Sequence, residues 1–192
     1  MSIKKIKPFV KNIRIPDFLL PAKDVLIFLL LLFSFHFVYL FWSQTIGFFP
    51  LAGTVEWLFR VTSENLLAQS ILLLQLAGVE ISVLGATLQS CHAFVRVAPE
   101  CTTLKQWLHW IIIMAFFPGP AKHKLWFIPA GLAIIHATNL LRITGLLVLQ
   151  FPFPGMFDFF HDYVFKPLFY AVIFGMWVLW NEKIRKSGSS KV

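Results

Sequence analysis

The sequence predicts an all-α polytopic membrane protein, with a bundle of four to six transmembrane helices and a small extracytoplasmic β-hairpin. Of its 192 residues, 58% are hydrophobic and only 14% are charged, whereas a soluble domain carries about 25% charged residues. The 17 basic residues exceed the 9 acidic ones, and they cluster at the two ends of the chain. This distribution is typical of membrane topology signals. The composition therefore excludes an ordinary cytosolic enzyme, and no nucleic-acid partner is expected.

The N-terminal part predicts a basic cytoplasmic leader followed by a membrane anchor. Residues 1–24 carry six basic side chains before the apolar run Val25–Trp42. This run is interrupted only by Ser34 and His36 and is long enough to span about 27 Å as a helix. It ends in bulky aromatic residues, not in the small residues of a signal-peptide cleavage site, so we interpret it as an uncleaved anchor.

Residues 43–100 must cross the membrane an even number of times, in two crossings or none. Leu66–Gly78 is short for a span. It is either re-entrant or interfacial, or it pairs with Ile46–Leu58 as a weak hairpin of spans. Val79–Val83 and Ala93–Val97 alternate apolar and polar side chains, which predicts a β-hairpin outside the membrane.

Three further apolar segments are expected to cross the membrane: Cys101–Phe117, Leu125–Leu149 and Phe165–Trp180. A basic turn, Pro118–Lys124, separates the first two, and residues 182–192 form a basic tail. Basic loops favour the cytoplasm, so leader, turn and tail are all predicted there, with residues 25–181 as one membrane-embedded domain. With these three segments on the cytoplasmic side, the order of the crossings places Cys101, Arg142 and His161 on the outer side of the membrane.

Polar side chains in these apolar segments form two helical stripes. On one helix face lie Cys101, Lys105 and His109, and on another lie His136, Asn139 and Arg142. His161 and Asp162 follow in a predicted loop before the last span. Polar residues in hydrocarbon are costly enough to indicate a function.

These residue types match cysteine acyl-transfer chemistry. Cys101 lies at a predicted helix N-terminus, where the helix dipole favours a reactive thiolate. His161 can take the thiol proton and return one to a leaving amine. Arg142 can stabilise an oxyanion or bind a substrate carboxylate. Three residues are predicted to support them: Lys105 by its charge, and Asn139 and Asp162 by orienting the guanidinium or imidazole.

Each of these residues also has a purely structural interpretation. A cysteine can simply pack, an arginine can reach to the membrane interface, and His161 with Asp162 can form an ordinary loop pair. Cys91 and Cys101 can alternatively form a disulfide, which would block Cys101 as a nucleophile.

The ordered motifs resemble those of the exosortase/archaeosortase family of membrane cysteine transpeptidases, in particular its short bacterial members. The motifs are Val61–Leu67, Ala98–Cys101, Asn139–Ile143 (Asn-x-x-Arg-Ile) and Phe160–Asp162. By position, the resemblance implies Cys101 as nucleophile, with Arg142 and His161 as its catalytic partners. It also implies a location in the bacterial inner membrane, with both termini cytoplasmic and the site extracytoplasmic.

The same resemblance implies the reaction and its partners. The substrates would be secreted proteins whose C-terminal sorting signal has a short motif, a hydrophobic helix and a basic tail. Cleavage would form a Cys101 thioester, which water or an acceptor amine on a glycan or lipid would resolve. The surrounding membrane lipid is the other partner, and neither a metal nor an organic cofactor is expected.

Two other functions remain open from the sequence. A membrane b-type cytochrome would use two of four histidines, His36, His109, His136 and His161, as haem ligands. A non-catalytic assembly or transport subunit would not need the Cys101 thiol.

Overall fold

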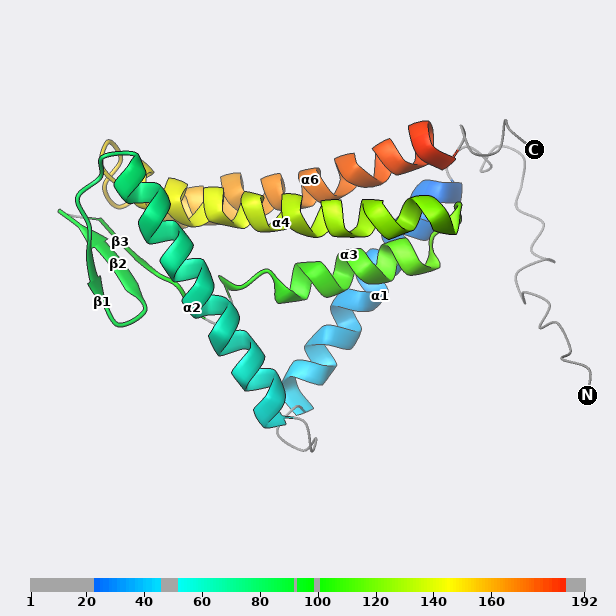
Figure 1. Cartoon of the computed structure of the whole chain (residues 1–192), viewed down its shortest axis with the longest axis horizontal. Helices are drawn as coiled ribbons and strands as arrows, with labels where there is room; N and C mark the ends of the chain where they lie inside the picture. The colour runs from blue at the N-terminus through cyan, green and yellow to red at the C-terminus, as the bar shows by residue number, and fades with distance from the viewer. Residues whose placement is uncertain (1–22, 46–51, 92, 99–100, 186–192) are drawn as a thin grey trace, which may run out of the picture.

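The computed structural model describes residues 23–45, 52–91, 93–98 and 101–185. Five long helices form most of this part: α1 (Lys23–Thr45), α2 (Ala52–Leu76), α3 (Leu104–Phe116), α4 (Ala121–Leu149) and α6 (Lys166–Leu179). The short helix α5 (Phe157–Phe159) and the π-helical segment η4 (Phe160–Phe165) lead into α6, and a second π-helical segment, η5 (Trp180–Arg185), continues it. In Figure 1, α3, α4 and α6 lie roughly parallel, while α1 and α2 diverge from them as a V.

Three helical stretches in the described part are long and apolar enough to cross a membrane: Lys23–Phe41, Ala121–Leu149 and Phe157–Ile184. They contain or largely coincide with three of the predicted spans, namely Val25–Trp42, Leu125–Leu149 and Phe165–Trp180. α3 has 13 residues and is therefore about 20 Å long, short of the roughly 30 Å hydrocarbon core. A mostly helical membrane protein with a small antiparallel sheet is confirmed.

α2 is one continuous helix of 25 residues. The predicted break between Ile46–Leu58 and Leu66–Gly78 is therefore wrong, although residues 46–51 lie outside the described part. No glycine or proline interrupts the chain between Gly53 and Gly78, and the polar residues in between lie mostly on the exposed face. A buried face recurs every three or four residues at Ser63, Leu66, Ser70 and Leu74. The helix ends at Leu76, and Gly78 shortly after it adopts a left-handed φ of 74°.

The polar segment after α2 folds into a three-stranded antiparallel sheet. Its strands β1 (Ser82–Leu84), β2 (Thr87–Ser90) and β3 (Ala93–Arg96) are ordered β1-β2-β3. The predicted direct pairing of Val79–Val83 with Ala93–Val97 is therefore wrong, because β2 lies between them. In β2, the exposed Gln89 lies between the buried Leu88 and Ser90, and this alternation is too short to predict a strand from the sequence.

α4 links two hydrophobic clusters. Its first half packs with α1, α3 and α6 around Trp110, Trp177 and Trp180, all buried. Its second half packs with α2 and the sheet around Leu66, Leu88 and other buried apolar residues. Gln150, at the end of α4, donates to the Phe94 carbonyl of β3 at 3.2 Å. The sheet is thereby attached to the helix that carries Asn139 and Arg142.

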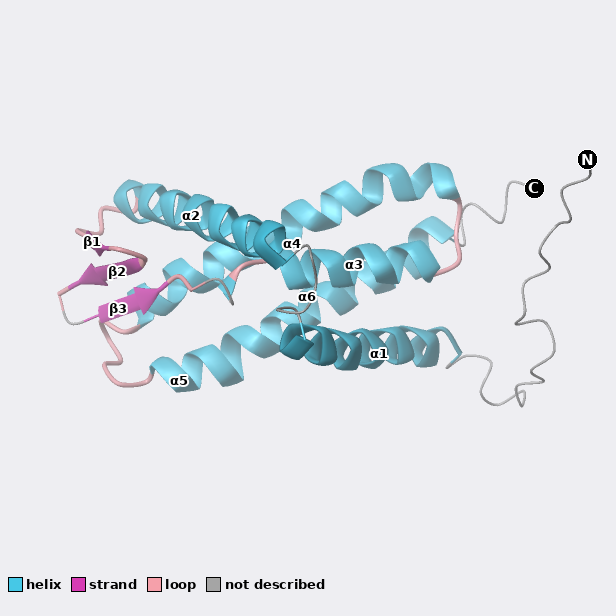
Figure 2. Cartoon of the chain, turned by 90° about the horizontal axis from the view of Figure 1, so that it is seen from below, coloured by secondary structure: helices cyan, strands magenta, loops and turns pink. Residues whose placement is uncertain are grey.

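The charged helix ends gather at the opposite end of the molecule from the sheet (Figures 1 and 2). The start of α1, the turn between α3 and α4, and the end of α6 lie together there. Lys124 donates to the Phe117 carbonyl at 2.7 Å and to the Ala115 carbonyl at 3.2 Å, so it caps the C-terminus of α3. One end of the fold thus holds the helix termini to which the predicted leader, basic turn and tail are attached.

α3 and α4 approach closely at Gly131. The indole nitrogens of Trp107 and Trp110 donate to the backbone carbonyls of Leu132 and Ile128, at 3.1 and 3.3 Å. A side-chain carbon at Gly131 would overlap the indole of Trp110, whose side chain is fully buried. This glycine is therefore required for the contact between the two helices.

Replacing Gly131 with alanine is expected to lower the free energy of unfolding by about 1–3 kcal/mol, because the buried indole has no room to move. Thermal unfolding of the detergent-purified protein measures the effect. Gly175→Ala in α6 is the matched control, since nothing lies within 4 Å of the added carbon and alanine favours a helix. Equal melting temperatures for the two variants would contradict this packing.

Candidate active site

Cys101 lies in a tight turn immediately before α3. Its amide donates to the Ala98 carbonyl at 2.8 Å, and its sulfur lies 4.0 Å from the Arg96 carbonyl oxygen. α3 begins only at Leu104, so the prediction that a helix starts at Cys101 is wrong by one turn. The thiol is half-buried and free, and Cys91 is exposed and also free. The alternative disulfide between the two cysteines is not formed.

A side chain of α4 holds the Cys101 turn in place. The Asn139 amide nitrogen donates to the Cys101 carbonyl at 2.8 Å, and Asn139 is only 1% exposed. Arg142 lies one turn further along α4, half-buried, and its Nε is buried with no hydrogen-bond partner in the described part of the chain. The structure thus attaches the cysteine segment to the turn of α4 that carries the arginine.

Unpaired polar atoms occur on both of the segments that this hydrogen bond joins. Besides Arg142 Nε, the hydroxyls of Thr102 and Thr103 and Oε1 of Gln106 are buried and have no partner among the described residues. Buried polar groups are normally hydrogen-bonded, because leaving one unpaired costs about 1–3 kcal/mol. The two segments therefore have hydrogen-bonding capacity available for water or for polar groups of a ligand.

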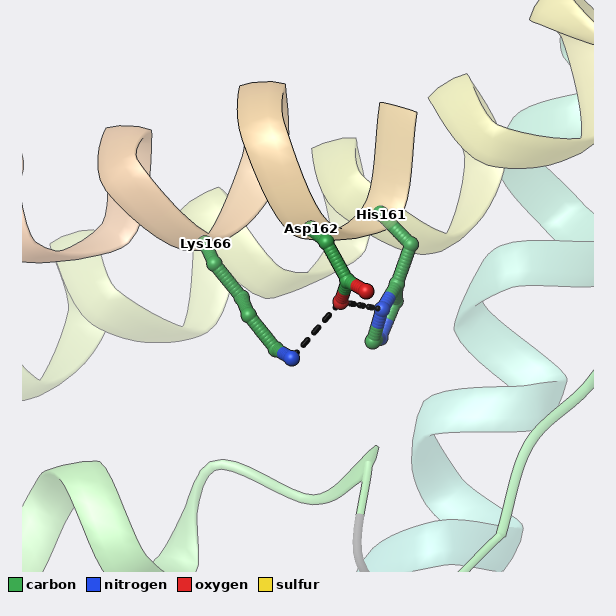
Figure 3. Close-up of polar contacts among 3 residues, drawn as sticks. All are labelled: His161, Asp162 and Lys166. Carbon is green, nitrogen blue, oxygen red and sulfur yellow. Dashed lines mark hydrogen bonds and ion pairs between the residues drawn. The ribbon is translucent and has the colours of Figure 1, made fainter. Parts of the chain in front are cut away.

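His161 is held in a defined orientation by two neighbours. Its Nδ1 lies 2.7 Å from Asp162 Oδ1, and its ring stacks on Phe157 with the ring centroids 5.7 Å apart. The Lys166 ammonium donates to the same carboxylate oxygen at 2.6 Å. In Figure 3 the His161, Asp162 and Lys166 side chains all point to one side, toward the segment that leads into α3. With Nδ1 donating to the carboxylate, Nε2 is the nitrogen that can accept a proton.

The structure places His161 and Asp162 in the π-helical segment η4, which corrects the predicted loop. Pro167 follows this segment, in the first turn of α6. Proline has no amide hydrogen to donate to the carbonyl four residues earlier, here that of Tyr163, which favours a wider turn at this point. Such π-helical turns are frequent at functional sites.

Lys105 does not share the surroundings of Cys101. Its ammonium lies 4.4 Å from the ring centroid of Tyr39 in α1, and its side chain lines a cavity between α1, α3 and α6. The predicted face of Cys101, Lys105 and His109 fails because Cys101 precedes the helix. Lys105 and His109 line the cavity between α1, α3 and α6, whereas Cys101 lies in the turn before α3.

The histidines considered as haem ligands are divided between different places: His36 and His109 line one cavity, and His136 lines another. His136 is bound to Gln69 Oε1 at 2.6 Å and lines a cavity of about 360 Å³ between α2, α3 and α4. His109 stacks on Phe35, with ring centroids 4.6 Å apart, and lines the cavity near Lys105 together with His36. His109 and His136 therefore do not face one pocket. Within the described residues, no three His, Cys, Asp or Glu side chains converge as a metal site would require.

Comparison with known protein families assigns the chain to one family. A family model described as transmembrane exosortase matches residues 25–179, which extends from α1 to the end of α6. The chain belongs to the transmembrane exosortase family. No curated protein and no solved structure matches it. The family is one of membrane cysteine transpeptidases, and the matched range of this exosortase includes Cys101, Arg142 and His161.

Two residues of this exosortase's candidate site were missed in the sequence, Phe157 and Lys166. Both contact the His161–Asp162 pair, through ring stacking and through the Asp162 carboxylate. The i,i+4 spacing of Asp162 and Lys166 is the spacing of a helical ion pair. This spacing is informative only within a helix, and the segment is helical instead of the predicted loop.

Proposed function

We propose that this exosortase is a cysteine peptidase or transpeptidase that cleaves C-terminal sorting signals from secreted proteins. The reaction takes place on the extracytoplasmic side of the cell membrane. Cys101 is the nucleophile, His161 the general base and acid, and Arg142 the group that stabilises the oxyanion. Asn139 positions the Cys101 turn, and Asp162 positions His161 and is itself held by Lys166.

The reaction has two stages that share one thioester. His161 Nε2 takes the Cys101 thiol proton, and the thiolate attacks the carbonyl carbon of the scissile peptide bond. Arg142 stabilises the resulting oxyanion. The intermediate collapses as His161 returns the proton to the leaving amine, which carries the C-terminal segment away. Water or an acceptor amine then attacks the thioester and loses a proton to His161, which restores the thiol.

The observation that carries this proposal is the hydrogen bond from Asn139 to the Cys101 carbonyl. It joins the cysteine turn to the Asn-x-x-Arg turn of α4, which also carries Arg142 with its unpaired Nε. A packing cysteine and an arginine reaching for the membrane interface would not need this connection. The orientation of His161 by Asp162 supports the proposal from a separate helix.

The reactivity of the Cys101 thiol tests the mechanism and its membrane side together. Intact cells expressing the Cys91→Ala protein are treated with a membrane-impermeant maleimide at several pH values. An ordinary thiol loses about tenfold in rate per pH unit in its protonated range, because only the thiolate reacts. We expect Cys101 to lose much less than this between pH 8 and pH 6. His161→Ala and Arg142→Ala should restore the ordinary dependence.

Two results would contradict the proposal. An ordinary thiol dependence in the Cys91→Ala protein itself would remove the activated nucleophile. Labelling that requires cell lysis would place Cys101 on the wrong side of the membrane. The Cys91→Ala, Cys101→Ala double variant controls for labelling of other groups.

A further inference from the structure

A mostly apolar cavity with a few polar groups lies in the helical bundle, and neither His161 nor Asp162 lines it. It has a volume of about 270 Å³, is partly open, and has walls formed by α1, α3 and α6. Its lining residues are Leu32, Phe33, Phe35, His36, Lys105, His109 and Tyr170. Most of its surface is thus apolar or aromatic, and its polar groups are one ammonium and two imidazoles.

The polar groups of this cavity have no acidic counterpart in its described lining. Lys105 contacts the ring face of Tyr39, an arrangement that leaves its hydrogen-bond donors available. His109 is only 6% exposed, and its Nε2 is buried without a hydrogen-bond partner in the described structure. A lysine ammonium beside a buried imidazole nitrogen that has no hydrogen-bond partner is a combination that suits an anion.

The position of the cavity among the membrane-spanning helices restricts which anions can reach it. His36 lies in the second half of the Lys23–Phe41 span, nearer to its Phe41 end, and ionisable residues within a span normally mark a functional site. Phe33 and Tyr170 line the cavity and are 56% and 51% exposed on the outer surface of the helices. A ligand that enters here passes along apolar surface, so it must carry an apolar part as well as its anionic group.

We propose that the cavity binds the phosphate headgroup of an anionic membrane lipid. Lys105 supplies the positive charge, and His36 and His109 donate hydrogen bonds to phosphate oxygens. The aromatic and aliphatic walls contact the glycerol and the first part of an acyl chain. The volume is slightly below the roughly 300–1,000 Å³ of pockets that bind whole drug-sized molecules, which suits a headgroup.

This site is independent of the thiol chemistry, because none of its lining residues belongs to the proposed reaction. Its test is therefore a binding measurement on the full-length protein. The delipidated protein in a neutral detergent is titrated with phosphatidylglycerol, phosphatidylcholine or glycerol phosphate. Native mass spectrometry counts the lipid retained, and the melting temperature reports its effect on the folded state.

We expect phosphatidylglycerol to be retained and to raise the melting temperature, with phosphatidylcholine much weaker and glycerol phosphate ineffective. Lys105→Gln should weaken phosphatidylglycerol binding by at least about fivefold, because a lysine near a lipid phosphate contributes about 1 kcal/mol. Lys122→Gln is the matched control, since Lys122 is exposed in the first turn of α4 and should leave binding unchanged. His36→Phe removes a donor while keeping a ring, and it replaces Lys105→Gln if that variant fails to fold.

Three outcomes would overturn the lipid site. Equal retention of phosphatidylglycerol and phosphatidylcholine would show that the headgroup is not recognised. An equal effect of glycerol phosphate would identify a free phosphate in place of a lipid. Equal binding by Lys105→Gln and Lys122→Gln, with His36→Phe also unchanged, would show that lipid binds elsewhere on the surface.

Discussion

Replacing Cys101 with alanine is expected to stop removal of C-terminal segments from this exosortase's substrates, with a loss of at least about 10³-fold in rate. The loss is large because the thioester cannot form, and the remaining groups provide only binding and oxyanion stabilisation. Cys101→Ser should be nearly as inactive, because His161 in this setting must then deprotonate a much weaker acid. The measurement is quantitative mass spectrometry of C-terminal peptides in cells whose own copy is replaced by each variant.

Cys91→Ala is the matched control for this experiment. Cys91 is exposed and free, and it lies in the connection between β2 and β3, so its removal should leave processing at the wild-type level. Normal processing by Cys101→Ala would eliminate the cysteine mechanism. It would favour the non-catalytic assembly or transport subunit instead.

The second large effect is expected at His161. His161→Gln should lower the processing rate by about 10²–10⁴-fold, because a glutamine cannot take the thiol proton or return it to the amine. Asp162→Asn should also lower it strongly, since an amide in place of the carboxylate can donate to Nδ1 and so favour the wrong imidazole tautomer. Both variants are measured by the same C-terminal peptide assay, with protein abundance as a check on folding.

Asp158→Asn provides the matched control for the acidic residue. Asp158 is exposed in α5, within the same helical run, and no hydrogen bond to His161 is formed from it in the described structure. Its replacement should leave processing unchanged. If Asp162→Asn and Asp158→Asn behave alike, Asp162 does not position the imidazole, and if His161→Gln remains active, another group moves the proton.

The helices that face lipid were predictable because their composition alone distinguishes them. Val25–Trp42 and Leu125–Leu149 lie within α1 and α4, since long apolar runs have no stable alternative in a membrane. α2 was not predictable in the same way. Its exposed polar residues broke the apolar run into two pieces, and only its packing against α4 shows that Ser63, Leu66, Ser70 and Leu74 form one buried face.

The sequence by itself determined which residue types are present in the candidate site and their order along the chain. Cys101, Asn139, Arg142 and His161 stand out as polar residues in apolar surroundings, and such residues are costly to keep there without a reason. Only the tertiary structure decided how these residues are grouped. It placed Asn139 on the Cys101 carbonyl and Asp162 and Lys166 around His161, and it moved Lys105 to the cavity at Tyr39. The physical reason is that helical spacing fixes neighbours only within one continuous helix. Where α3 begins, and where η4 replaces a loop, depends on packing and backbone hydrogen bonds between segments far apart in the chain.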